Sequence, residues 1–384
     1  MSDKGQLIIT NFDRFRRKNS REVYLSFQKT LEDSVDQRQK ILGGSCVELV
    51  NVGETQDSSN WKSVKKFLIA KCDIDKYDSA LLIGNDDIVP FCRFPNNADG
   101  EVVYSDSYYF DLQEGTDHYP VLSVGRLPDT LGHDDGHLLL DLIQKASEYQ
   151  EQVSPCDQGG ITSEVWYYIS RTILEQASLP FDNLISSPPF GVVASKVVRF
   201  PLTENHLKAQ SILLFNLHGE KETPYWFGER RNNGVGDWLE AGSEISVALT
   251  PEFVDQCNLI NSLVISSACH TTAILDKEIN TSLALSFLNR GCLAVIGPSS
   301  TAYSYRVKRG SSVSLTGINL ICYLFLKNVI DGKPLGESLR LAKVYYSSRN
   351  EYDDVNILGC NLLGDPRIKI QWNQERRGVY DRVR

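Results

Sequence analysis

Short apolar runs bounded by turn residues alternate along this chain with segments whose apolar residues recur at helical spacing. The runs predict buried strands at residues 80–90, 121–128, 164–170, 195–200, 211–219, 262–270 and 292–300. Helical spacing is found in residues 136–153, 282–290, 317–332 and 335–349. The strand candidates are continuously apolar rather than alternating, so they predict an α/β fold with a mostly parallel sheet sandwiched by helices.

The chain length and one polar stretch predict two subdomains. A chain of 384 residues exceeds one ordinary domain. The helical pattern of residues 136–153 runs into "SPCDQGG", which is typical of a boundary. We therefore expect a smaller N-terminal α/β subdomain over residues 1–155 and a larger subdomain over residues 156–384. In mostly parallel sheets, functional side chains gather at the carboxyl ends of the strands.

The composition is that of a globular protein, with 41% apolar and 23% charged residues. No window has the roughly 18–20 continuous apolar residues of a membrane-spanning helix, so we expect no membrane partner. The formal net charge of −9 argues against nucleic-acid binding, which needs a basic surface, and suits cationic substrates or partners.

The cysteines indicate a reduced protein without a structural metal. There are nine of them, with no C-x-x-C pair, and several lie inside apolar runs. The histidines other than His218 and His270 show no ligand spacing, so we expect no metal and no cofactor. The N-terminus has scattered charges and no secretory apolar region. These features predict a cytoplasmic location.

Two strand candidates end in chemically active residues. The run "SILLFNLHGE" leads into His218 and Gly219, and "SLVISSACHT" leads into Cys269. If the two strands are parallel neighbours, both side chains emerge at the same edge of the sheet. A cysteine nucleophile needs such a base within hydrogen-bond reach, and Gly219 would let a backbone N–H point at a developing oxyanion.

Each of these residues also has a plain structural interpretation. A cysteine at the end of an apolar run is usually a small packing group, and a lone His-Gly pair is usually a structural histidine. Two tips of matching type, in the right order, favour the catalytic interpretation. His270 is a rival base, but its side chain should diverge from that of its neighbour Cys269 on a turn.

The paired tips resemble the signature of the caspase/gingipain clan of cysteine peptidases. His218 precedes Cys269 by 51 residues, close to the roughly 50 residues of caspases. The segments "ALLIGNDDIVP", "VYSDSYYFDL" and "TDHYPVLSVGRLP" resemble the small first subdomain of gingipains, and "NLLGDPRIKI" resembles the G-D-P motif that closes their fold. The resemblance spans roughly residues 75–370 and implies a gingipain-like fold.

The resemblance implies a role for several residues. Cys269 would be the nucleophile and His218 the general base or acid, while the amides of Gly219 and Cys269 would form the oxyanion hole. The segment "IGPSSTAYSY" corresponds to the loop that walls the P1 pocket, so Tyr303 and Tyr305 are candidate wall residues. Ordinary loop aromatics are the alternative interpretation of these two tyrosines.

Two features depart from the gingipain pattern. Gingipains place a carboxylate after the strand that corresponds here to "WYYIS", and this chain continues with Arg171, so a third catalytic residue stays open. Arginine-specific members also use an acidic residue at the base of the P1 pocket. Glu175 and Asp182 are candidates for substrate binding, and a buried carboxylate would favour a basic P1 residue.

The leading hypothesis is a cysteine endopeptidase that acts on proteins or peptides through an acyl-enzyme. The secreted relatives carry leader, pro- and trailing segments that this chain does not show, which suggests an intracellular, regulated enzyme. Dibasic sites in residues 228–237 and 305–312 predict a zymogen activated by cleavage. An activating peptidase or a regulatory protein would then be a further partner. Solvated loops are the alternative explanation of these charges.

Two other classes compete with the peptidase hypothesis. A catalytically silent interaction module could keep the fold, because a fold does not guarantee a function. The neighbouring Gly219 and Ala268 argue against a decayed site. A nucleotide-binding protein is disfavoured because no phosphate-binding glycine motif follows a strand candidate.

Overall fold

The fold is seen in a computed structural model. It describes residues 4–43, 46–96, 98–112, 120–130, 136–148, 157–179, 184–187, 207–209, 211–230, 244–304, 307–309, 312–348 and 354–370.

A ten-stranded sheet runs through the described part of the chain, in the order β2-β1-β3-β6-β17-β14-β13-β9-β7-β8. Its strands are β1 (Gly5–Thr10), β2 (Val47–Asn51), β3 (Tyr77–Ile83), β6 (Ser123–Leu127), β7 (Asp157–Ser163), β8 (Leu184–Ser187), β9 (Ser211–Asn216), β13 (Leu263–Ser266), β14 (Ala294–Pro298) and β17 (Cys360–Gly364). Every neighbouring pair is parallel except β14 and β17. The predicted mostly parallel sheet is confirmed.

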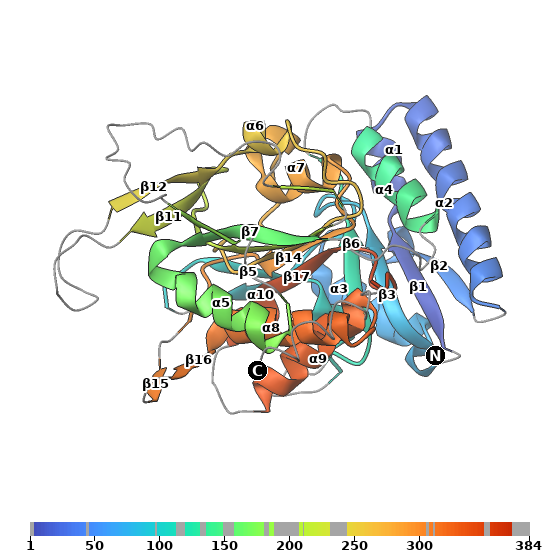
Figure 1. The fold of residues 1–384 in the computed structure, drawn as a ribbon. Coiled ribbons are helices and arrows are strands. Elements are labelled where there is room, and N and C mark those ends of the chain that lie inside the picture. The colour runs from blue at the N-terminus through green and yellow to red at the C-terminus, as the bar shows by residue number, and fades with distance from the viewer. Residues whose placement is uncertain are drawn as a thin grey trace.

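The described helices are α1 (Phe12–Lys18), α2 (Arg21–Ile41), α3 (Trp61–Lys71), α4 (His137–Glu148), α5 (Tyr167–Gln176), α6 (Pro251–Val254), α7 (Leu283–Asn289), α8 (Gly317–Ile330), α9 (Leu335–Ser347) and α10 (Asp354–Gly359). In Figure 1, α6 and α7 lie on one face of the sheet, and α5, α8 and α9 lie on the other. Residues of the central strands such as Val264 and Val295 are fully buried. Such coverage explains the continuous apolar strands of the sequence.

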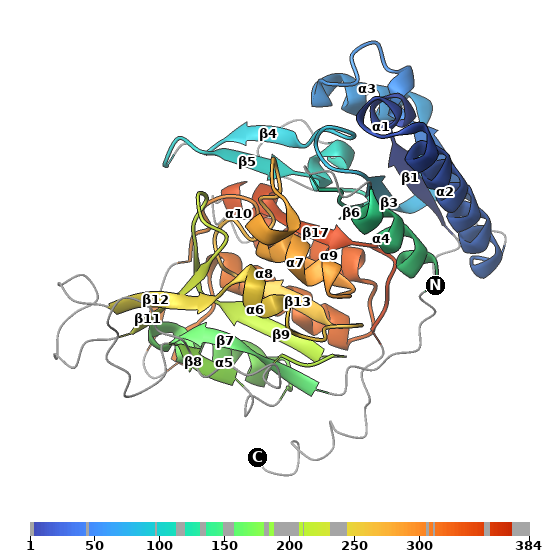
Figure 2. The same ribbon diagram turned by 90° about the horizontal axis from the view of Figure 1, so that it is seen from above.

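Smaller ribbons and single-turn helices complete the described chain. The ribbons are β4 (Cys92–Pro95) with β5 (Val102–Ser105), β10 (His218–Gly219) with β11 (Trp226–Arg230) and β12 (Glu244–Leu249), and β15 (Val307–Arg309) with β16 (Ser312–Ser314). The single-turn helices are η1 (Val52–Glu54), η2 (Ile74–Lys76), η3 (Ser107–Phe110), η4 (Glu164–Trp166) and η6 (Ile279–Thr281). Figure 2 shows the β4–β5 hairpin beside α10, at the edge of the C-terminal part of the molecule.

The strand predicted at residues 164–170 is wrong. These residues form η4 and the start of α5, and the strand is β7, directly before them. The stretch "SPCDQGG", which is typical of a boundary, thus contains the start of a core strand. It has few apolar side chains because the backbone of β9 passes close by: a Cβ on Gly160 would lie 1.8 Å from the Leu214 carbonyl oxygen. The strand predicted at residues 195–200 lies outside the described residues.

The G-D-P motif joins the two ends of the described fold. Asp365 is buried and forms an ion pair with Arg38 of α2, whose guanidinium also donates to Gln6 of β1. Its other oxygen accepts the Arg367 N–H at 2.9 Å. Removing either partner would leave a buried charge uncompensated, which makes this contact structurally important.

The sheet continues without a break across the predicted subdomain boundary. Strand β6 of the first segment pairs with β17 from the end of the chain, and β3 pairs with β6 over its length. The boundary at residues 155–156 falls just before β7 and remains a prediction. Among the described helices, none is both long and apolar enough to cross a bilayer.

Candidate active site

The ends of β9 and β13 bring the two predicted residues to the same edge of the sheet. The strands are parallel neighbours, with Phe215 opposite Ser266. Cys269 and His218 each follow those paired residues by three positions. The juxtaposition expected from the sequence is therefore present in the register of the sheet.

A tight turn holds Cys269 at the tip of β13. The Ser267 N–H donates to the Phe215 carbonyl at 2.9 Å, and the Thr271 hydroxyl donates to the Ala268 carbonyl at 2.7 Å. His270 takes a positive φ of 58°, a left-handed conformation that reverses the chain. These contacts fix the backbone on both sides of Cys269.

A buried network of polar side chains underlies the strand tips. The Ser267 hydroxyl donates to Asn216 Oδ1 at 2.7 Å, and Asn216 Nδ2 donates to Ser170 Oγ at 3.0 Å. The Ser170 and Thr162 hydroxyls lie 2.8 Å apart. The network joins β7, β9, the β13 turn and α5, and each hydrogen bond satisfies a group hidden from water.

The His218 ring is held between an aromatic ring and a carboxylate. Its Nε2 lies 2.8 Å from Glu229 Oε2, and its ring centroid lies 4.4 Å from that of Trp166 in η4. The side chains of His218 and Glu229 are 35% and 22% exposed. Because a carboxylate accepts, Nε2 donates, and Nδ1 is then the basic nitrogen of the neutral ring.

Glu229 is the site residue that the sequence interpretation missed. It lies in residues 228–237, whose charges predict a cleavable loop. In the structure His218 pairs with Phe227 in an antiparallel ribbon, so Glu229 lies two residues along on the same face. The Glu229 N–H is held by the Ser163 hydroxyl at 3.1 Å. The sequence signal for this ribbon is the segment "WFGER", in which apolar and polar side chains alternate as in a short strand that follows a turn.

Strand β7 ends at Ser163, ahead of the segment "WYYIS" that corresponds to this strand in the gingipain pattern. The pattern places a carboxylate after residue 170, where Arg171 begins the next stretch. With β7 ending at Ser163, Glu164 is the carboxylate that directly follows the strand.

Gly219 lies against the backbone of Cys269. A Cβ on Gly219 would lie 2.0 Å from the Cys269 carbonyl oxygen and 3.3 Å from its nitrogen. Only a residue without a side chain permits this approach. The backbones of Gly219 and Cys269, whose amides are predicted to form the oxyanion hole, are thus in direct contact.

The Cys269 thiol is partly buried beside the loop after β14. Its Sγ accepts the Ala302 N–H at 3.2 Å and lies 3.8 Å from the Ala302 carbonyl. Burial raises the pKa of the thiol, the amides of Ala302 and Cys269 oppose this, and Glu101 and Asp99 add to the rise. Burial and the two carboxylates therefore favour the neutral thiol over the thiolate.

His270 pairs with a carboxylate of the β4–β5 hairpin. Its Nε2 lies 3.4 Å from Glu101 Oε2, and its backbone N–H donates to the Ser300 carbonyl. Burial lowers the pKa of His270 despite this carboxylate, and Lys221 and Lys277 lower it further. These contacts tie the residue to the hairpin.

Tyr303 lies where the loop after β14 meets the hairpin. Its hydroxyl donates to Asp99 Oδ2 at 3.2 Å and accepts from Asn96 Nδ2 at 3.3 Å. Its backbone N–H donates to Asn356 Oδ1 of α10 at 3.1 Å. The next residue toward Cys269, Ala302, contacts the thiol itself. Tyr303 therefore lies at the edge of the site, one residue from the sulfur contact.

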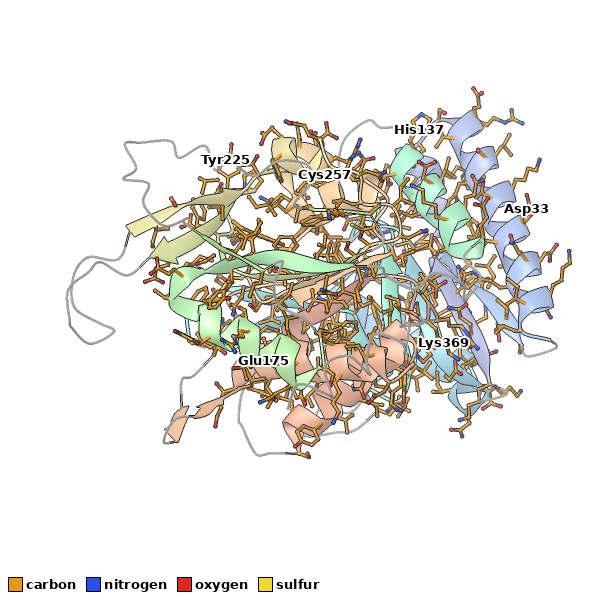
Figure 3. The ribbon with its side chains drawn as sticks, in the orientation of Figure 1. Asp33, His137, Glu175, Tyr225, Cys257 and Lys369 are labelled. Atoms are coloured by element: carbon orange, nitrogen blue, oxygen red, sulfur yellow. The ribbon has the colours of Figure 1, made fainter. Side chains whose placement is uncertain are left out.

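Of the other predicted pocket residues, Glu175 lies in the described part of the chain, and it is not brought to this site. Glu175 is 40% exposed on α5 and pairs with Arg171 at 2.8 Å. It lies nine residues beyond Trp166, about 13 Å along a helix. Figure 3 shows Glu175 and Tyr225, which precedes β11, on opposite sides of β7. Asp182 and Tyr305 lie outside the described residues.

The fold and this edge of the sheet define a class of protein. A helix-covered, mostly parallel sheet with a thiol and an imidazole at adjacent strand tips is the gingipain/caspase-like arrangement.

Comparisons with known proteins agree. Residues 248–371 match the model of peptidase family C25. No curated protein matches the chain. The predicted resemblance to gingipain-type enzymes is confirmed, and the match indicates a cysteine-type peptidase.

Solved structures show the same fold. The chain resembles the Arg-specific cysteine proteinase gingipain R with a TM-score of 0.65 and 13% identity, over 96% of this chain and 79% of that one. It resembles the complex of Porphyromonas gingivalis RgpB pro- and mature domains with a TM-score of 0.62 and 14% identity, over 95% and 79%. A structure described as a protease resembles the chain with a TM-score of 0.60 and 10% identity, over 96% of this chain and 79% of that one.

Proposed function

We propose that the protein is a cysteine endopeptidase in which Cys269 is the nucleophile and His218 the general base and acid. The observation that carries the proposal is the parallel register of β9 and β13, which sets the two residues three positions beyond the paired Phe215 and Ser266. The close approach of the Gly219 and Cys269 backbones also supports an active site at this edge of the sheet.

Proton transfer begins at the Cys269 thiol, whose neutral form is favoured by burial. His218 Nδ1 takes the Cys269 proton as the sulfur attacks the scissile carbonyl, and the C–O double bond becomes an oxyanion. The imidazolium then gives this proton to the leaving amine as the C–N bond breaks. Water, deprotonated by the same ring, hydrolyses the thioester and returns the enzyme.

Backbone amides would stabilise the oxyanion. The amides of Gly219 and Cys269 lie on touching segments, and neither needs a side chain to donate. Glu229 would hold the His218 ring in one tautomer and stabilise its charged form during proton transfer. In this role Glu229 is a positioning residue.

A preference for basic P1 residues is part of the proposal. Glu101 and Asp99 act on the electrostatics of Cys269, and both contact the loop that carries Ala302 and Tyr303. A cationic side chain bound beside Cys269 would be attracted by these carboxylates. The likeness to an Arg-specific proteinase supports the same preference.

Activation by cleavage is also proposed. The Arg230–Arg231 site follows Glu229 directly in the chain. A cut there would fall just after Glu229 and leave the contact between Glu229 and His218 within one chain segment. The site in residues 305–312 follows the loop that holds the thiol. If the active species proves to be an intact chain by mass spectrometry, activation by cleavage is refuted. The cytoplasmic location stays a prediction from the cysteine pattern.

The test is cleavage of a mixed peptide library and of basic-P1 reporter peptides, before and after treatment with trypsin that is then inhibited. The wild type should cleave after Arg or Lys, and Cys269→Ala and His218→Ala should lose at least about a thousandfold in kcat/KM. Equal cleavage by wild type and Cys269→Ala would overturn the proposal and favour a silent interaction module.

A further inference from the structure

A separate pocket lies on one face of α3, outside the candidate active site. Its hollow of about 540 Å³ is lined by Trp61, Lys62, Lys65, Lys66, Ile69, Ala70 and Tyr108. The α3 residues recur every four positions, so they form one face of the helix. The volume lies within the range of sites that bind ligands or peptide side chains.

The charge of the pocket is opposite to that of the molecule. Three lysines line it, although the chain has a formal net charge of −9. Lys65 donates to the Asp111 carbonyl at 2.6 Å and lies 3.7 Å from the centre of the Tyr108 ring, and the buried Asp111 carboxylate also acts on its charge. Lys62 and Lys66 are exposed.

The walls of the pocket are apolar and aromatic. Ile69 is 41% exposed, a high value for a large aliphatic side chain. Trp61 meets the edge of Tyr108, with ring centroids 5.8 Å apart. Aromatic rings flanked by cations suit a ligand that combines carboxylates with an apolar side chain.

The aromatic wall extends toward the candidate active site. Phe94 of β4 packs on Trp61 and Tyr108, with centroids 5.6 and 4.6 Å apart. Two residues later, Asn96 donates to the hydroxyl of Tyr303. A partner bound on α3 would therefore contact the β4–β5 hairpin. The tip of this hairpin contacts the loop after β14, which holds Ala302 and Tyr303.

We propose that this pocket binds an acidic peptide segment of a partner protein, with an apolar side chain between Trp61, Ile69 and Tyr108 and carboxylates on the three lysines. Charge complementarity selects this occupant. The proposal concerns binding alone and does not rest on the peptidase activity.

The test uses fluorescence anisotropy of the fluorescein-labelled peptide Asp-Glu-Glu-Phe-Glu-Asp with the full chain carrying Cys269→Ala. We expect saturable binding that weakens with salt, and little binding of the Asn/Gln analogue. The double variant Lys62→Glu/Lys66→Glu should weaken binding at least tenfold, and Lys66→Ala should weaken it less. Both altered lysines are exposed, so the fold should persist, as circular dichroism would verify.

The matched control is Lys29→Glu/Lys40→Glu, which reverses two exposed lysines of α2 and should change binding less than twofold. Three outcomes would overturn the proposal: no binding of the acidic peptide, an equal loss in the α2 control, or tighter binding of an oligo-dT strand than of the peptide.

Discussion

At the residue scale, His218 shows how its environment prepares a side chain for proton transfer. Trp166 packs on the ring, and Glu229 accepts from Nε2, which leaves Nδ1 as the basic nitrogen. The position of His218 could be predicted, because an apolar strand ending in His-Gly is visible locally. Its partner could not, because a ribbon formed by residues 218–230 selects it.

Glu229→Gln should lower kcat by about 10- to 100-fold, part of the roughly 10²–10⁴ that a general base contributes. The amide keeps the shape but loses the charge that favours the imidazolium. KM should change less than kcat, because Glu229 contacts the ring rather than the substrate. The measurement is steady-state kinetics on a reporter peptide.

The control for this substitution is Glu220→Gln, which changes an exposed carboxylate two residues beyond His218. A loss of kcat as large in the control, or no loss in Glu229→Gln, would contradict the positioning role.

At the element scale, the strands with apolar runs were predictable, and the strand built on glycine was not. Segments such as β13 and β14 bury every residue, so they show in the sequence as apolar runs. Strand β7 contains "DQGGITS", whose glycines make room for the backbone of β9. Its role depends on a neighbour distant in the sequence, and local patterns do not contain that information.

The close packing of Gly219 in the two-residue strand β10 leads to a prediction for the variant Gly219→Ala. In Gly219→Ala the new methyl group would overlap the Cys269 carbonyl oxygen, and backbone cannot rotate away as a side chain can. We expect kcat/KM to fall by at least about a hundredfold, because small displacements at a reacting centre cost about that much. Kinetics and the thermal midpoint are measured together.

Glu220→Ala is the matched control, since its side chain is exposed and next in the chain. Full activity of Gly219→Ala would show that the close approach is unimportant for the site.

At the scale of the whole molecule, the sheet unites the two predicted subdomains, and buried polar contacts cross between them. Lys343 of α9 is buried, and its Nζ donates to the Ser107 hydroxyl of η3 at 2.9 Å. Burial lowers its pKa to about 8, against the opposing effects of Cys360, Asp106 and Asp111. Such long-range contacts cannot be read from the chain, whereas its fold class could.

Lys343 predicts a pH dependence of the free energy of unfolding. Its folded pKa is about 8 and its ordinary value is 10.5, so between these values only the unfolded chain holds the proton. Stability therefore rises as the pH increases through this window, by up to about 3 kcal/mol from this group. Urea unfolding at pH 7.5 to 10 would measure the rise.

Lys343→Met lacks the titrating group and serves as the reference. The difference in stability between wild type and variant should change across the window in favour of the wild type. Parallel profiles for the two proteins would contradict the assigned pKa.

The central claim is that Cys269 is a nucleophile activated by His218. Labelling with an arginine-directed chloromethyl ketone, followed by peptide mass spectrometry, tests it most directly. The protein is examined intact and after limited cleavage at its dibasic sites. The account predicts one label on Cys269, none in Cys269→Ala and at least tenfold slower labelling in His218→Ala. A label on another cysteine, or equal rates in wild type and His218→Ala, would contradict it.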